Sequence, residues 1–185
     1  MPPSFFRYHG QYKREPLTVE ERLKLENACQ TYREKLIVFG LLDTGLRVSE
    51  FCAIKRPDVD WQNSSIRVHG KGGPFGKESK VRAVPLSERA KNLFDIYLSG
   101  SKGNAINFTT KTAQREVENI ARKADIAKRV TPHVLRHTFA VEAIKKGISL
   151  RALQQVMGHD HITTTEIYLN YGDKNALDEF KKKWE

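Results

Sequence analysis

The stretch Thr131-Pro132-His133-Val134-Leu135-Arg136-His137 contains the start of a predicted helix that runs from His133 to about residue 146. Further along the chain, Gly158-His159 precedes Thr164-Thr165-Glu166-Ile167-Tyr168, and Gly45-Leu46-Arg47-Val48-Ser49-Glu50 lies upstream. These segments supply arginines, histidines and a tyrosine without a cluster of carboxylates, which makes them a poor metal site. They suit a phosphodiester, because it needs cations for its oxygens and a hydroxyl group to attack its phosphorus.

The charge of the chain points to a polyanionic partner. The 185 residues include 32 Lys and Arg against 22 Asp and Glu, a formal net charge of +10. A domain this basic usually binds nucleic acid, so we expect double-stranded DNA as the partner. Charge alone leaves open a basic protein that does not bind DNA.

The remaining composition predicts a cytoplasmic protein with no membrane partner. Cys29 and Cys52 lie in apolar surroundings and form no CxxC pair, which favours buried thiols in a reducing compartment. The longest apolar run, Leu36–Leu42, is too short to span a bilayer, and Met1–Ser4 does not begin a signal peptide.

The periodicity predicts a mostly α fold with a small antiparallel β-sheet (α+β). Thr18 and Glu21 form a predicted capping box, and Gly45, Gly147 and Gly158 are predicted helix stops. The expected helices cover residues 18–28, 32–44, a short turn from 49 that ends before 57, 87–98, 110–124, 133–146, 149–157, 162–171 and 175–184.

Ser65–His69 and Val81–Pro85 alternate apolar and polar residues and predict the two strands of a hairpin. A glycine-rich connection, residues 70–77, joins them. Basic residues dominate the hairpin, which reads as a cationic finger or as an ordinary solvated turn. These residues are Arg67, Lys71, Lys77, Lys80 and Arg82.

His133 and Arg136 lie three residues apart and share a helix face, which predicts that they face a phosphate together. His133 and His137 also have the spacing of structural histidines or of a zinc pair. A zinc-protease motif needs Glu directly after the first histidine, and this chain has Val134 there. The metal interpretation is therefore the weaker one.

Arg47 follows a predicted helix stop, where backbone N–H groups help an arginine to hold an anion. Glu50, three residues later, is expected to hold the guanidinium group in place. Tyr168 lies on the predicted helix after His159, and a lone helical tyrosine there is either an ordinary core or surface residue or a nucleophile. Tyr171, one turn later, is a rival nucleophile in similar local context.

Four segments in register resemble the tyrosine recombinase (phage integrase) family. Leu41–Glu50 resembles the first conserved box, and His133–Ala140 with Met157–Tyr168 resembles the second. Gly70-Lys71-Gly72, followed by Arg82–Leu86, is similar to the lysine hairpin of the family. The resemblance covers roughly residues 17–171.

The resemblance implies a role for each matching residue. Arg47 and Arg136 match the arginines that hold the scissile phosphate, and His133 matches the general acid/base. His159 matches a hydrogen-bond donor to that phosphate. Lys71 matches the lysine that protonates the leaving 5′ oxygen, with Lys77 and Lys80 as alternatives because the connection is long. Tyr168 matches the nucleophile that forms a 3′-phosphotyrosine. Neither metal, ATP nor another cofactor is implied.

The resemblance also implies an organisation and an assembly. Residues 1–16 are expected to be a linker or the remnant of an N-terminal DNA-binding region, and residues 17–185 a catalytic domain. Residues 173–185 are expected to form a tail helix that docks either on its own core or on a neighbour. The expected assembly is a homotetramer on DNA and a monomer or weak oligomer without it. A type IB topoisomerase-like enzyme and a DNA-binding module without activity are the alternatives.

Overall fold

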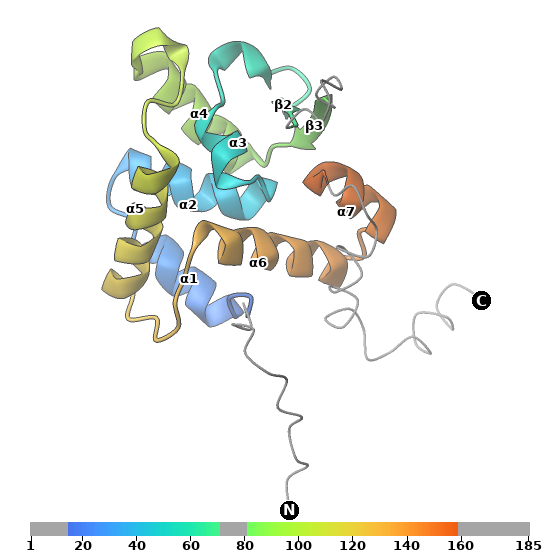
Figure 1. Ribbon diagram of the computed structural model, residues 1–185. Helices are drawn as coiled ribbons and strands as arrows, with labels where there is room; N and C mark the ends of the chain where they lie inside the picture. Colours follow the sequence, from blue (N-terminus) through green and yellow to red (C-terminus); the bar gives the residue numbers. More distant parts are fainter. Residues whose placement is uncertain (1–14, 71–80, 159–185) are drawn as a thin grey trace, which may run out of the picture.

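The computed structural model describes residues 15–70 and 81–158, and their fold is mostly helical with one small antiparallel sheet, as predicted (Figure 1). The elements run in the order α1 (Val19–Asn27), α2 (Tyr32–Thr44), α3 (Val48–Cys52), η1 (Arg56–Asp58), β1 (Val59–Asp60), β2 (Ser65–His69), β3 (Val81–Pro85), α4 (Glu88–Gly100), η2 (Lys102–Asn104), α5 (Thr110–Lys123), α6 (Pro132–Lys145) and α7 (Leu150–Met157). The predicted helices at 162–171 and 175–184 lie outside the described residues.

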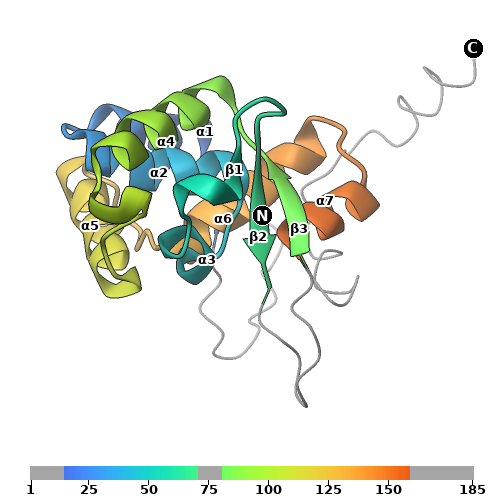
Figure 2. The ribbon, with the colours of Figure 1, turned by 90° about the horizontal axis from the view of Figure 1, so that it is seen from above.

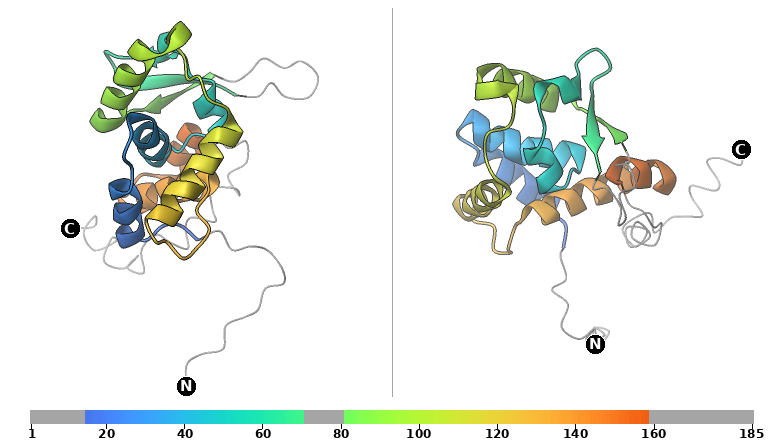
Figure 3. Two further views of the ribbon diagram at one scale, coloured as in Figure 1. Left: turned by 90° about the vertical axis from the view of Figure 1, so that its left-hand side faces the viewer. Right: turned by 45° about the horizontal axis from the view of Figure 1, so that its top comes forward.

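Helix α2 is the central element of the fold. It packs against α1, α3, α4, α5 and α6, and Figure 3 shows it in the middle of the helical part. Its apolar run places Leu36, Ile37 and Leu41 in the core with no exposed surface. Burial of such side chains contributes about 1.5–3 kcal/mol each, so the core fixes α2 and with it the corner at Gly45.

Local hydrogen bonds set most helix ends where the sequence predicts them. Thr18 and Glu21 form the predicted capping box of α1, and Ser149 caps α7 through the N–H of Ala152. Gly45 and Gly158 end α2 and α7 in the left-handed conformation, with φ of 61° and 62°. Helix α6 begins one residue earlier than predicted, because Thr131 is its N-cap and proline is favoured at the first helical position.

The sheet has three antiparallel strands in the order β1-β2-β3, one more than predicted. Val59 and Asp60 pair with Ile66 and Ser65. Two residues are too few to show alternation, which is why the sequence did not reveal β1. In the second pair of strands, Val68 lies opposite Arg82.

Helix α7 lies against both β3 and α6, as Figure 2 shows beside the edge of the sheet. Leu153 and Met157 of α7 form a small apolar cluster with Ala140, Val141 and Ala143 of α6. This cluster brings the C-terminal end of α7 to the part of the fold where α2 ends.

The two cysteines lie in the apolar surroundings that the sequence predicts. Cys29 is buried, Cys52 is partly buried, and both are free cysteines. Burial raises the pKa of Cys29 to about 12 and that of Cys52 to about 11. Within residues 15–70 and 81–158, no helix has the length and apolar character needed to cross a bilayer.

Candidate active site

Arg136 of α6 joins two helix ends that lie far apart in the sequence. Its side chain is buried, and its Nη1 donates to the carbonyl oxygen of Gly45 at the end of α2. Its Nη2 donates to the carbonyl oxygen of Met157 at 2.7 Å. A buried guanidinium group is costly unless its N–H groups are paired, so these carbonyls hold Arg136 in one orientation.

Arg47 is the N-cap residue of α3, two residues after Gly45. Its Nη1 donates to Glu50 Oε1 at 2.9 Å, which confirms the predicted role of Glu50 in holding the guanidinium group. Its Nη2 donates to the carbonyl oxygen of Gly158 at 3.1 Å. Glu50 Oε2 also accepts the backbone N–H of Arg47 at 2.9 Å. This backbone N–H is therefore paired within the protein.

The two arginines meet at the C-terminal end of α7. Arg136 is bound by the carbonyl of Met157 and Arg47 by the carbonyl of the next residue, Gly158. A helix C-terminus carries partial negative charge on its last carbonyls, which attracts cations. The fold thus brings Arg47 and Arg136 together, although 88 residues separate them in the sequence.

Arg82 is the part of this site that the sequence did not identify. The sequence places it among the basic residues of the hairpin, but its side chain points inward and is only 13% exposed. Its Nε donates to the carbonyl oxygen of Val156 at 2.8 Å. The signal was present in the alternation of β3, since Arg82 lies on the same strand face as the fully buried Val84.

Glu50 accepts hydrogen bonds from both Arg47 and Arg82. Arg82 donates from Nη1 to Oε1 at 3.1 Å and from Nη2 to Oε2 at 2.8 Å, in a two-point pair. Burial by itself raises the pKa of Glu50, but the hydrogen bonds from Arg82 and Arg47 outweigh this effect and lower the pKa below its usual value. Glu50 therefore stays ionised at neutral pH and fixes two cations.

The two histidines of α6 differ in exposure. His133 in the first turn is exposed, whereas His137, one turn later, is buried. Burial, followed by the nearby charge of His133, lowers the pKa of His137. This supports a structural role for His137 in its neutral form. Among residues 15–70 and 81–158, no group of three or more His, Cys, Asp or Glu side chains is arranged to hold a metal ion.

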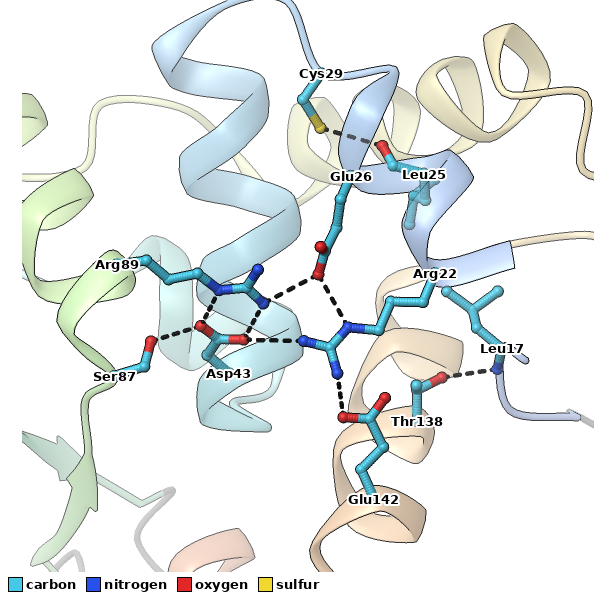
Figure 4. A network of polar contacts seen from close by, with 10 residues as sticks. All are labelled: Leu17, Arg22, Leu25, Glu26, Cys29, Asp43, Ser87, Arg89, Thr138 and Glu142. Carbon is cyan, nitrogen blue, oxygen red and sulfur yellow. Dashed lines mark hydrogen bonds and ion pairs between the residues drawn. The ribbon is translucent and has the colours of Figure 1, made fainter. Parts of the chain in front are cut away.

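An ion-pair network around Asp43 supports the end of α2 (Figure 4). The largely buried carboxylate of Asp43 accepts Ser87 Oγ at 2.5 Å and Arg89 Nε at 2.6 Å. Arg22 of α1 lies near Asp43, with Nη2 3.7 Å from Oδ1, and also pairs with Glu142 of α6. The corner that carries Gly45 and Arg47 is therefore tied to α1, α4 and α6.

Three of the predicted site residues lie outside the described residues. They are Lys71, His159 and Tyr168, and the rival nucleophile Tyr171 lies there too. In the sequence, His159 follows Gly158, whose carbonyl binds Arg47, and Lys71 follows the end of the described hairpin strand.

Comparison with known proteins shows the family to which the chain belongs. The model of the phage integrase family matches residues 15–175. Tyrosine recombinase XerA of Saccharolobus solfataricus is 36% identical over 163 residues, which cover 87% of this chain and 52% of that protein. The chain thus spans about half the length of this relative.

Solved structures show the same likeness. A crystal structure of XerA recombinase has a TM-score of 0.77 at 33% identity, with 98% of this chain and 66% of that chain covered. The Tn1549 transposon integrase, solved in complex with circular intermediate DNA, has a TM-score of 0.71 at 26% identity, with 94% and 67% covered. With a family match over most of its length and two such structural neighbours, the chain belongs to the phage integrase family of tyrosine recombinases.

Proposed function

We propose that this chain is the catalytic part of a site-specific DNA recombinase, which cleaves and rejoins DNA strands through a 3′-phosphotyrosine. The observation that carries the proposal is the meeting of Arg47 and Arg136 at the carbonyls of Met157 and Gly158. Two guanidinium groups with fixed orientation suit an anion, and in the sequence Gly158 immediately precedes the segment that contains the candidate nucleophile.

The arginines supply the charge that the reaction needs. A phosphodiester under attack gains negative charge on its non-bridging oxygens, and guanidinium groups that are already oriented stabilise it without reorganisation. Arg47 and Arg136 each bind one of these oxygens in this scheme. Replacement of either residue by lysine removes the planar pair of donors, so we expect a loss of about 10²–10³ in rate.

The other predicted residues complete the reaction. Tyr168 attacks the phosphorus and becomes linked to the 3′ phosphate, while the 5′ oxygen leaves. Lys71 protonates that oxygen, since an alkoxide is a poor leaving group. His133 acts as general acid/base and His159 donates a hydrogen bond to the phosphate. The phosphotyrosine retains the bond energy until a DNA hydroxyl attacks it, so the scheme uses neither a metal nor ATP.

Double-stranded DNA is the proposed partner. The net charge of +10 supports it, as does the similarity to the Tn1549 integrase, which was solved with DNA. We further propose that four copies assemble on DNA to exchange strands, while the chain without DNA is a monomer or weak oligomer.

A selection for covalent adducts tests the proposal and identifies the DNA site. The protein is incubated with a pool of duplexes that carry a randomised segment and a nick, so that cleavage releases a short fragment and traps the enzyme. Adducts that survive SDS are recovered and the DNA is sequenced. We expect adducts from the original chain and from Tyr171→Phe, none from Tyr168→Phe, and enrichment of a defined sequence.

Each other outcome identifies a different error. If Tyr171→Phe abolishes the adduct and Tyr168→Phe does not, the nucleophile is misassigned. Adducts without sequence enrichment, together with relaxation of any supercoiled plasmid, indicate a type IB topoisomerase-like enzyme. The absence of adducts at every site, with DNA binding intact, indicates a binding module and contradicts the proposed function.

A further inference from the structure

Arg82 holds together the three parts of the site that the hairpin, α3 and α7 contribute. It lies in β3, opposite Val68, and this strand follows the connection containing Lys71 in the sequence. Its guanidinium group reaches across to α7 through Nε and to Glu50 of α3 through both terminal nitrogens. The packing is tight at this point, because a Cβ atom on Gly158 would lie 2.9 Å from Arg82 Cζ.

Three consecutive carbonyls at the end of α7 each accept a hydrogen bond from an arginine. The carbonyl of Val156 accepts a hydrogen bond from Arg82. That of Met157 accepts one from Arg136, and that of Gly158 accepts one from Arg47. The proposed function assigns contacts with the phosphate to Arg47 and Arg136. All three side-chain nitrogens of Arg82 donate within the protein, Nε to Val156 and both terminal nitrogens to Glu50. Its place among the three is therefore that of a support rather than of a phosphate ligand.

Glu50 transmits the position of Arg82 to Arg47. The same carboxylate oxygen, Oε1, accepts both Arg47 Nη1 and Arg82 Nη1. The two-point pair with Arg82 fixes the plane of the carboxylate, and this plane sets the direction in which Arg47 extends. Without Arg82, Glu50 can rotate about its side-chain bonds and Arg47 can follow it.

We propose that Arg82 is a positioning residue, which orients Arg47 through Glu50 and fixes strand β3 to the end of α7. This inference rests on the proposed function, because it concerns the rate at which the phosphate is attacked. Displacement of a reacting group by about 1 Å can cost 10²-fold in rate, so we expect Arg82→Gln to slow adduct formation by about 10- to 100-fold. DNA affinity should change little.

The experiment measures single-turnover adduct formation and DNA affinity with the nicked duplex recovered by the selection described above. Arg82→Gln should slow the reaction at saturating DNA, and Arg82→Lys should be slowed to a similar extent. Lysine keeps the charge but cannot bind both oxygens of Glu50 and the carbonyl of Val156 at once. The slope of log affinity against log salt should stay that of the original chain, whereas loss of one phosphate contact lowers it by about 0.9.

Arg33→Gln is the matched control. Arg33 also forms a two-point pair with a glutamate, Glu116 of α5, but it lies in the first turn of α2. Arg33 is about 18 Å along the helix from Gly45, given a rise of 1.5 Å per residue. We expect Arg33→Gln to react at the rate of the original chain.

A double variant separates positioning from a loss of folding. If Arg82 acts through Glu50, the variant with both Glu50→Gln and Arg82→Gln reacts no more slowly than the slower single variant. The inference is contradicted if the rate losses of the two single variants multiply in the double variant. It is also contradicted by full activity of Arg82→Lys, by an altered slope of log affinity against log salt, or by a rate loss in Arg33→Gln equal to that in Arg82→Gln. Thermal unfolding identifies any variant that is not folded, and the double-variant comparison is then made with Glu50→Gln and Arg82→Lys. If the original chain itself forms no adduct, the proposed function fails; if it does and Arg82→Gln is as fast, only this inference fails.

Discussion

The substitution Gly45→Ala tests the corner on which the arginine site is built. Gly45 has φ of +61°, and a Cβ atom there would lie 2.2 Å from Cδ1 and 2.6 Å from Cε1 of Phe139 on α6. Alanine in the left-handed conformation costs about 1–2 kcal/mol. Overpacking of a filled site costs about 1–3 kcal/mol more. The free energy of unfolding should therefore fall by about 2–5 kcal/mol, out of a total of about 5–15 kcal/mol for a typical domain.

Gly147→Ala is the control that isolates the backbone contribution. Gly147 has φ of +79°, and nothing lies within 4 Å of the position of its Cβ atom. It should lose only the conformational part, about 1–2 kcal/mol. Urea denaturation followed by circular dichroism gives both values, provided that the slope of the transition is unchanged.

A second variant isolates the clash. Truncation of Phe139 to alanine removes the ring that the new methyl group meets, so the double variant with Gly45→Ala should be less destabilised than the sum of the single variants by about 0.5–3 kcal/mol. Equal losses in Gly45→Ala and Gly147→Ala, or strict additivity with Phe139→Ala, would refute the reasoning. Because the carbonyl of Gly45 accepts Arg136, folded Gly45→Ala should also form the DNA adduct more slowly.

Three further predictions concern pH, thiols and metal. Burial alone raises the pKa of Glu34, but two backbone N–H groups and Lys123 outweigh it and lower the pKa to about 2. The stabilisation by ionised Glu34 is thus complete above its usual pKa of about 4.5 and is lost as the pH falls towards 2. Glu34→Gln should lower the free energy of unfolding by about 1 kcal/mol at pH 7, and this difference from the original chain should shrink in acid. A difference that stays constant with pH contradicts the prediction. With their raised pKa values, Cys52 should react with a disulfide reagent at pH 7.5 about 100-fold, and Cys29 about 1000-fold, more slowly in the native protein than in urea, because each unit of pKa lowers the thiolate fraction about tenfold. Equal rates would show that the thiols are accessible. A chelator should leave the yield of covalent adduct unchanged in the selection assay, and a loss restored by added metal would contradict the proposed scheme.

Several features of the site could be read from the sequence because their causes are local. A capping residue lies within a few residues of the N–H groups it serves, so Thr18 with Glu21 and Ser149 were identifiable. The ion pair of Arg47 with Glu50 spans one helical turn. The pattern of motifs also indicated the family, since their order and gaps are properties of the chain itself.

Other features depend on packing between elements that are remote in the sequence. The inward direction of Arg82 follows from the contact of β3 with α7, which places the carbonyl of Val156 within its reach. Asp43 looks like any acidic residue in the sequence, yet it is the centre of a network that ties four helices together. The two residues of β1 form a strand only because they pair with two residues of β2.

Local patterns in the chain were enough to predict most helix ends, the fold class and the residue types available for phosphate chemistry. The meeting of Arg47, Arg82 and Arg136 at the end of α7 depends on the folded protein. This is because an arginine carries five N–H donors on a long flexible stem and can satisfy them at any carbonyl within reach. Only the packing of the helices against each other determines which carbonyls those are.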